Sequence, residues 1–179
     1  MVYIELIIGC MTSGKTTELL QKINRRLTTK KNKVLYVRPE KDTRAELTHD
    51  LKTVDVEICV VDKLMKIREK VFDYDAVFID EVQFLNDACE FVKYVEQYQK
   101  RLQYIAFSGL SGDSERKPWP VVTNLIPLVD NLLFLKALCV ECENGQEAAF
   151  SKCCVEKKDK VLIGNSEVYR ATCRHHFFF

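Results

Sequence analysis

The chain has 179 residues, of which 47% are apolar and 30% are charged, enough for one α/β domain with a sizeable core and a small appended module. Its formal net charge is only +1, so no strong field favours nucleic acid or an anionic membrane as a partner. The sequence contains no recognisable secretory leader and no stretch long enough to span a membrane. We therefore expect a cytoplasmic protein without a nucleic-acid or membrane partner.

Short β-rich runs alternate with helical patterns over the first three-quarters of the chain. Strands are predicted over residues 2–8, 33–38, 56–61, 76–80, 103–107 and 132–136. Several are apolar on both faces, which is typical of a sheet covered on both sides. One helix face is marked by Leu19, Leu20, Ile23 and Leu27, and a second by Phe84, Ala88, Phe91, Val92, Val95 and Tyr98. This pattern predicts a doubly wound, mainly parallel α/β sheet with ligands beyond the carboxyl ends of the strands.

The pattern changes after about residue 137, where short strands, polar turns and clustered cysteines begin. We expect a nucleotide-binding α/β domain over residues 1–137 and a small zinc-binding module over residues 138–179. The eight cysteines are expected to be thiols and metal ligands, because a nucleotide-binding chain without a leader is not a disulfide scaffold.

The first motif is a phosphate-binding loop at residues 9–16, between the first predicted strand and a helix-like stretch. It fits the pattern G-x-x-x-x-G-K-[ST] in the context that the pattern requires, which makes a chance match in a glycine turn the weaker reading. Backbone N–H groups in such a loop form an anion site at the helix N-terminus. Lys15 is expected to reach the β- and γ-phosphates of ATP, and the Thr16 hydroxyl to ligate Mg²⁺. The nucleotide-binding candidates are Gly9, Met11, Thr12, Ser13, Gly14, Lys15 and Thr16.

The second motif is a buried strand that ends in two carboxylates, Asp80 and Glu81. Asp80 is placed to hold Mg²⁺ or a water bound to it. Glu81 follows where the strand leaves the sheet, so it can accept a proton from an attacking hydroxyl or water. An ordinary strand end with two solvated acids is the alternative, which the upstream phosphate loop disfavours.

The third motif is a pair of cysteines, Cys139 and Cys142, followed by Cys173 and His176. Each two-residue gap lets a pair bind one metal ion from a tight turn, and two pairs complete a tetrahedral zinc site. Four protein ligands leave no open position, so the zinc is expected to be structural. Three alternative ligands remain open: His175, Cys153 and Cys154.

Weaker features have two readings each. Arg44 follows the second strand, where it either stabilises the charge of a transferring phosphoryl group or lies in a surface turn. Cys10 is either a small core or loop residue, like Cys59 and Cys89, or, because it lies within the phosphate loop, a thiol open to oxidation or alkylation. The basic cluster is either a solvated helix face or a nucleic-acid patch, and we favour the former; it comprises Lys22, Arg25, Arg26, Lys30, Lys31 and Lys33.

Taken together, these segments resemble the type II thymidine kinase family, the small cytosolic kind that also occurs in large DNA viruses. The resemblance covers nearly the whole chain in family order. It rests on residues 6–16, 41–44, 48–50, 79–84, 109–112, 116–118, 124–127, 139–142, 147–151 and 163–164, with Tyr169 and Cys173. The joint order of the segments is more specific than any one of them except the phosphate loop.

The resemblance implies transfer of the ATP γ-phosphate to the 5′-hydroxyl of thymidine, a step of deoxynucleoside salvage. Glu81 matches the catalytic base, and Asp80 and Thr16 match the magnesium residues. A loop over about residues 161–169 resembles the lasso that closes over the nucleoside. The implied substrate-binding residues are Met11, Phe84, Leu110, Ser151, Ile163, Gly164 and Tyr169. The family is usually a homotetramer inhibited by thymidine triphosphate.

This sequence departs from the family pattern in three places. Ser111 stands where an acid or amide is common, Ser114 where an aromatic is common, and His176 where a fourth cysteine is usual. Zinc tolerates the last change. Other function classes remain: a P-loop ATPase or GTPase whose zinc module binds nucleic acid, a structural zinc-ribbon protein and a nucleotide kinase. The acidic residues of the module disfavour nucleic-acid binding by the ATPase or GTPase class. The intact phosphate loop disfavours a purely structural protein, and the lack of an arginine-rich lid disfavours a nucleotide kinase.

Overall fold

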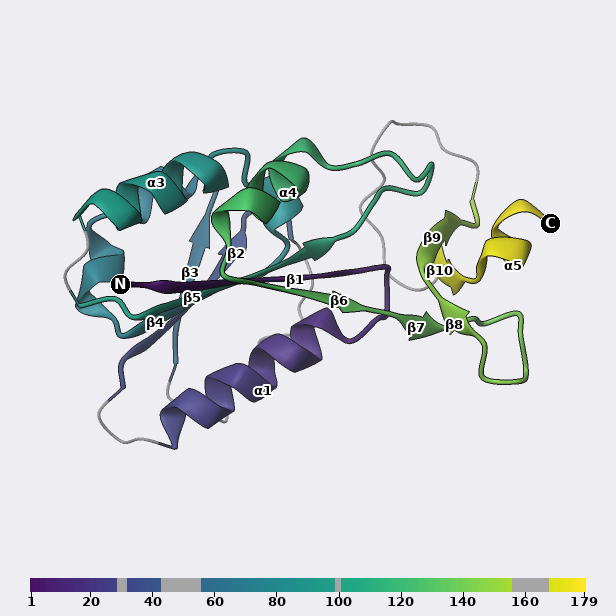
Figure 1. Ribbon diagram of the computed structural model, residues 1–179, viewed down its shortest axis with the longest axis horizontal. Helices are drawn as coiled ribbons and strands as arrows, with labels where there is room; N and C mark the ends of the chain where they lie inside the picture. Colours follow the sequence, from purple (N-terminus) through teal and green to yellow (C-terminus); the bar gives the residue numbers. More distant parts are fainter. Residues whose placement is uncertain (29–31, 43–55, 99–100, 156–167) are drawn as a thin grey trace.

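The computed structural model describes residues 1–28, 32–42, 56–98, 101–155 and 168–179. Its centre is a six-stranded sheet in the order β3-β2-β4-β5-β1-β6 (Figure 1). The strands are β1 (Tyr3–Gly9), β2 (Val34–Pro39), β3 (Glu57–Val61), β4 (Ala76–Ile79), β5 (Tyr104–Leu110) and β6 (Asn131–Leu135). Every ladder within this sheet is parallel. The six predicted strands and the predicted fold class are thus confirmed.

The sheet is covered on both faces because its strands alternate between two cores. Ile4, Leu6 and Ile8 of β1 belong to one core, and Ile7 belongs to the other. The first core lies under α3 (Ala88–Tyr98) and α4 (Pro120–Leu125), and the second lies against α1 (Lys15–Leu27). Figure 1 shows α1 on one side of the sheet and the other two helices on the opposite side. This alternation follows from the two-residue period of a strand.

The predicted face of α1 is confirmed, since Leu19 and Ile23 are fully buried. The second predicted helix face is wrong at both ends. Phe84 belongs to a separate 3-10 turn rather than to α3, while Tyr98 is 49% exposed and packs on Tyr94 at a ring-centroid distance of 4.6 Å. Apolar spacing alone does not detect the turn between residues 84 and 88. The 3-10 helices are η1 (Leu64–Ile67), η2 (Lys70–Asp73), η3 (Val82–Phe84) and η4 (Ile126–Leu128).

The C-terminal part consists of short elements beyond the carboxyl end of β1 (Figure 1). Strand β7 (Ala137–Leu138) pairs with β8 (Glu147–Ala148), and β9 (Phe150–Cys153) pairs with β10 (Tyr169–Thr172), both antiparallel. Helix α5 (Arg174–Phe178) follows. The predicted boundary between residues 137 and 138 falls within β7, and the division into two domains stays a prediction. We call residues 138–179 the C-terminal module.

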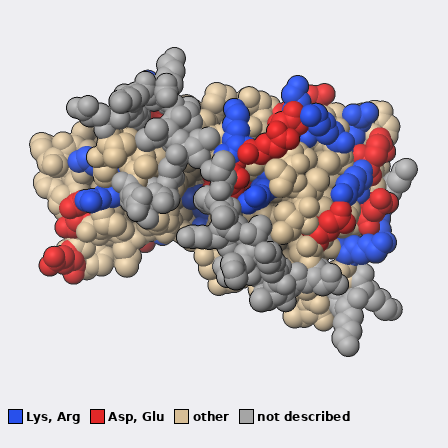
Figure 2. All heavy atoms as spheres, turned by 180° about the vertical axis from the view of Figure 1, so that it is seen from behind, with Lys and Arg blue, Asp and Glu red and all other residues tan. Residues whose placement is uncertain are grey.

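The basic cluster at α1 is partly engaged within the protein. Lys22 forms ion pairs with Glu5 at 3.1 Å and with Glu18 at 3.2 Å, and the Arg26 guanidinium lies 4.1 Å from the ring centroid of Tyr104. On the face in Figure 2, positive and negative side chains are interspersed rather than separated by sign. Among the helices described, none combines the length and apolarity needed to cross a bilayer.

Candidate functional site

The phosphate loop joins β1 to α1, and its two glycines are required by geometry. Gly14, the N-cap of α1, has a left-handed backbone with φ 83°, which favours glycine. At Gly9, a Cβ atom would lie 2.4 Å from Oγ of Ser13 and 2.6 Å from the carbonyl oxygen of Leu135. A side chain at Gly9 would clash with both atoms, whereas at Gly14 there is open space and only the backbone conformation favours glycine. Thr12 between them also has a positive φ, 58°.

Lys15 lies folded over this loop. Its side-chain Nζ donates a hydrogen bond of 2.6 Å to the carbonyl oxygen of Cys10 and one of 3.5 Å to Oγ of Ser13. The residue is only 7% exposed, so its ammonium group is held inside the curve of the loop. This places a cation next to the backbone N–H groups that form an anion site in such loops.

Asp80 lies directly after β4 and is fully buried. Its Oδ2 accepts hydrogen bonds of 3.0 Å from the hydroxyls of Thr16 and Tyr36. Its Oδ1 accepts from the hydroxyl of Ser108 and, at 3.0 Å, from the backbone N–H of Glu81. The structure thus joins the start of α1 to the end of β4 through one carboxylate, as the sequence predicts for the pair Thr16 and Asp80.

Sequence reasoning missed two members of this network, Tyr36 and Ser108. Both are fully buried, and they lie in β2 and β5, two strands in which most residues are apolar. Strand β5 lies between β4 and β1, so Ser108 stands between the carboxylate strand and the strand of the phosphate loop. A buried hydroxyl needs a hydrogen-bond partner, so a serine or tyrosine within a mostly apolar strand is the signal that could have indicated these two residues.

Glu81 has a left-handed backbone, with φ 50° and ψ 44°. This region is uncommon for residues other than glycine and frequently marks a functional constraint. Its carboxylate Oε2 accepts a hydrogen bond from the side-chain amide of Gln83. Position 83 lies within the family-like segment 79–84, but no role was assigned to it from the sequence.

The phosphate loop also contacts the C-terminal module. The backbone N–H of Met11 donates a hydrogen bond of 2.9 Å to Oγ of Ser151 on β9, so two predicted substrate-binding residues do meet. Next to Met11, Cys10 is 1% exposed and its Sγ donates to the carbonyl oxygen of Ala148. Burial also raises the pKa of the Cys10 thiol. The reading of Cys10 as a small core residue is therefore confirmed, and the reading as a thiol open to oxidation or alkylation is wrong.

The remaining predicted nucleoside residues lie at separate points. The backbone N–H of Leu110, at the end of β5, donates to Gln83 at 3.2 Å. Phe84 packs edge-on against Trp119 at 6.0 Å between ring centroids. Tyr169 begins β10, opposite Cys153 in the ladder. Three other predicted site residues, Arg44, Ile163 and Gly164, lie outside the described residues.

Phe84 also lines a cleft of about 370 Å³ at the carboxyl ends of β2 and β3. The cleft is lined by Pro39, Glu40, Lys41, Val61, Asp62, Lys63, Phe84, Asn86, Asp87 and Glu90. None of these residues belongs to the phosphate loop. Phe84 is therefore both a predicted nucleoside-binding residue and part of the lining of this cleft.

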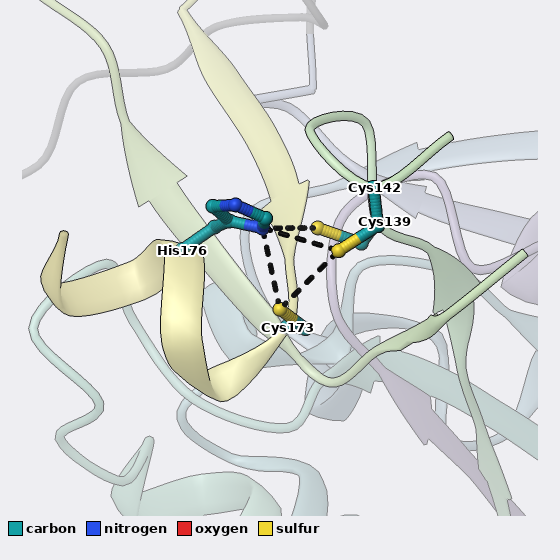
Figure 3. Close-up of side chains that lie close together, drawn as sticks. All are labelled: Cys139, Cys142, Cys173 and His176. Atoms are coloured by element: carbon teal, nitrogen blue, oxygen red, sulfur yellow. Dashed lines mark hydrogen bonds between the residues drawn. The ribbon is translucent and has the colours of Figure 1, made fainter. Parts of the chain in front are cut away.

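Cys139, Cys142, Cys173 and His176 converge in the C-terminal module (Figure 3). Their four ligand atoms all lie within 4.8 Å of one another. Nδ1 of His176 lies 3.6, 3.2 and 3.5 Å from the three Sγ atoms in sequence order, and Sγ of Cys142 lies 3.8 Å from that of Cys173. A tetrahedral zinc ion with Zn–S of about 2.3 Å and Zn–N of about 2.0 Å requires nearly these separations. The cluster is suited to hold zinc.

Backbone contacts bring this cluster together. The N–H of Val140, within the first cysteine pair, donates to the carbonyl oxygen of Ala171 at 3.1 Å, which ties this pair to β10. Cys173 caps α5, so His176 lies one turn further along the same helix. The adjacent His175 packs instead on Phe179, with ring centroids 5.3 Å apart.

The thiols of Cys153 and Cys154 contact backbone carbonyl oxygens rather than the cluster. All eight cysteines are free thiols, as predicted. Of the three alternative ligands left open by the sequence, none lies in the cluster, and His176 provides the imidazole.

Comparison with known proteins gives one consistent family. A family model described as thymidine kinase matches residues 2–177. The chain is 34% identical over 175 residues to the thymidine kinase of Raccoon poxvirus, covering 96% of this chain and 94% of the relative. It is 35% identical over 179 residues to thymidine kinase 1 of Dictyostelium discoideum (96% and 75% covered) and 32% identical over 179 residues to the cytosolic thymidine kinase of Homo sapiens (98% and 73%). The chain belongs to the thymidine kinase family.

Proposed function

We propose that this chain transfers the γ-phosphate of ATP to the 5′-hydroxyl of thymidine. The observation that carries the proposal is the hydrogen bond between Thr16 and Asp80, which joins the phosphate loop to the strand end that also bears Glu81. The phosphate loop and Glu81 therefore lie at one edge of the sheet, where parallel α/β folds bind their ligands, which supports their roles as phosphate site and general base. Membership of the thymidine kinase family supports the choice of acceptor.

The phosphate loop would bind the ATP phosphates through its backbone N–H groups and the ammonium group of Lys15. The hydroxyl of Thr16 and the buried carboxylate of Asp80 suit a magnesium ion, because oxygen ligands of this kind are the ones it prefers. When bound, Mg²⁺ would neutralise charge on the β- and γ-phosphates. Tyr36 and Ser108 hold the Asp80 carboxylate in place.

The chemical step would use Glu81 as a general base. The 5′-oxygen of thymidine forms a bond to the γ-phosphorus, the bond from that phosphorus to the β,γ-bridging oxygen breaks, and ADP leaves with the electron pair. The hydroxyl proton passes to the Glu81 carboxylate. Lys15 stabilises the charge that develops on the transferring group, and Arg44 is proposed to assist it.

The nucleoside would lie against residues of five segments, proposed from the resemblance. These residues are Met11, Phe84, Leu110, Ser151, Ile163, Gly164 and Tyr169. The contact between Met11 and Ser151 supports a pocket where the phosphate loop meets the C-terminal module. A zinc ion bound by Cys139, Cys142, Cys173 and His176 would stabilise that module.

Assembly and regulation are proposed on the family resemblance alone. We propose a homotetramer that is inhibited by thymidine triphosphate. A cytoplasmic location is supported by the relative from Homo sapiens, which is named as cytosolic.

The test is ADP release measured with four acceptors: thymidine, deoxycytidine, thymidine monophosphate and single-stranded DNA. We expect turnover with thymidine, none with single-stranded DNA and little with the nucleotide. The same assay on Glu81→Gln, which keeps the shape of the side chain and removes its basicity, should show kcat lower by about 10²- to 10⁴-fold with both substrates still bound. ADP release that is independent of thymidine would contradict the proposal.

A further inference from the structure

Gln83 connects Glu81 to the neighbouring strand. The residue lies in η3 and is 2% exposed. Its Nε2 donates a hydrogen bond to Oε2 of Glu81, and its Oε1 accepts one of 3.2 Å from the backbone N–H of Leu110. Both ends of the buried amide are therefore used, one on the carboxylate and one on the end of β5.

The orientation of this amide is determined by its partners. The Leu110 backbone N–H can only donate, so the amide oxygen must face it. The amide NH₂ group then faces the Glu81 carboxylate, to which it can only donate. Since the two ends are not interchangeable here, Gln83 presents a donor to Glu81 in one defined direction.

The strand beside the amide is shaped to admit it. Gly109 of β5 carries no side chain, and a Cβ atom there would lie 3.0 Å from Oε1 of Gln83 and 2.9 Å from Cγ1 of Val82. Glycine within a strand is destabilising relative to alanine. The close approach of the amide is a reason for glycine at this position.

Glu81 is constrained from its backbone as well. Its φ of 50° is unusual for a residue with a side chain, and its N–H donates to Asp80 at 3.0 Å. The backbone therefore determines where the side chain starts, and Gln83 holds one oxygen of the carboxylate, Oε2.

We propose that Gln83 is a positioning residue that orients the Glu81 carboxylate toward the acceptor hydroxyl. The inference rests on the proposed function, because it needs Glu81 to be the base. Gln83 itself does not contact the reacting atoms in this proposal. It also links the base to Leu110, a residue proposed for the nucleoside pocket, so that acceptor and base share one rigid support.

The test is a double-mutant cycle between positions 83 and 81. Gln83→Met keeps the length of the side chain and removes both hydrogen bonds. In the wild-type background it should lower kcat by about 10- to 100-fold, because a misplaced catalytic group costs up to about 10²-fold, with KM for ATP and thymidine within about twofold. In the Glu81→Gln background, the same change should alter the residual kcat by less than about twofold, since no base is left to orient.

A second variant guards against misfolding of the first. Gly109→Ala keeps the glutamine at position 83 but puts a Cβ atom against its amide oxygen, which should displace the amide. This variant should lower kcat in the wild-type background and change kcat little in the Glu81→Gln background. Thermal unfolding of each variant establishes which are folded, and Gly109→Ala carries the test if Gln83→Met is not. Thr123→Ala, an exposed hydroxyl on α4, serves as the matched control and should change nothing.

Two results would overturn the inference. One is an equal fold-loss of kcat in both backgrounds, which is the signature of general packing. The other is a raised KM for either substrate with unchanged kcat, which would make Gln83 part of a binding surface. Failure of the proposed function is read separately, from Glu81→Gln alone. If that variant has the wild-type kcat, Glu81 is not the general base, and Gln83 then has no base to position.

Discussion

Ser151 on β9 accepts a hydrogen bond of 2.9 Å from the backbone N–H of Met11, which lies 140 residues earlier in the chain. Ser151 is 5% exposed, so this contact is shielded from water. It joins the loop proposed to bind phosphates to the module that contains the cysteine cluster. The conformation of the loop near Met11 therefore depends on a residue of the C-terminal module.

Ser151→Ala should weaken ATP binding. The Met11 N–H would lose its acceptor, and an unsatisfied donor costs at least about 1 kcal/mol, or about fivefold in affinity. We expect KM for ATP to rise at least about fivefold in steady-state assays. If KM for ATP is unchanged, Ser151 does not organise the phosphate loop, and a rise in KM for thymidine alone would leave only its proposed contact with the nucleoside.

Lys15→Ala should give a folded protein with almost no kinase activity. The ammonium group lies inside the loop, where no substituted alanine can neutralise phosphate charge. We expect kcat to fall by about 10²-fold or more, measured as ADP release. Lys93→Ala, on the exposed side of α3, is the control and should retain normal turnover. Near-normal kcat in a folded Lys15→Ala variant would remove the phosphate-loop assignment.

The cysteine cluster should bind about one zinc ion per chain, measured by elemental analysis. Cys142→Ser should lose the metal and lower Tm by more than about 5 °C, because about 1 kcal/mol shifts Tm by about 2–4 °C in a chain of this size. The matched control is Cys154→Ser, an exposed thiol outside the cluster, which should keep both zinc and Tm. Undiminished zinc in Cys142→Ser would contradict the site.

Glu5 is a buried acid in the middle of β1, 4% exposed. It accepts hydrogen bonds from the Tyr104 hydroxyl, from Asn131 at 2.7 Å and from Lys22 at 3.2 Å. Burial alone would raise the pKa of Glu5, but the hydrogen bonds and the charge of Lys22 outweigh it, so the pKa lies below the usual 4.5. The same burial and the bond to Glu5 raise the pKa of Tyr104, which stays a donor.

This lowered pKa makes stability depend on pH in a defined direction. Between the folded pKa of Glu5 and 4.5 the unfolded chain binds more protons, so the contribution of Glu5 is complete above about pH 4.5 and is lost as pH falls through the folded value. In urea titrations, the difference in free energy of unfolding between wild type and Glu5→Gln should shrink as pH falls from about 4.5 through the folded pKa of Glu5. Glu96→Gln, an exposed acid on α3, should show no such trend.

Much of the fold could be predicted because the apolar pattern carries it. Strand β4 is a continuous apolar run and β1 is interrupted only by Glu5, and the proposed ligand-binding residues follow directly at their ends. The prediction was less accurate for β5, which continues to Leu110 rather than ending at residue 107. Ser108 and Gly109 interrupt the apolar pattern there, but the ladder with β1 continues through them.

The candidate site was predictable where spacing determines geometry and not where folding brings distant residues together. A gap of two residues within each pair was enough to propose Cys139, Cys142, Cys173 and His176 as one cluster, and the structure brings them within 4.8 Å. The hydrogen bond of Tyr36 to Asp80 depends on how β2 pairs with β4, which no local pattern reveals.

The left-handed backbone of Glu81 has a consequence for selection. A residue with a side chain loses about 1–2 kcal/mol in this conformation, which glycine would not. Thr12, with φ 58°, is in a similar position. A library of this chain screened only for heat resistance would therefore enrich glycine at residues 12 and 81 and discard the proposed base. A screen for higher thermal stability should therefore also select for kinase activity, because stability favours glycine at residue 81 and the proposed catalysis requires glutamate there.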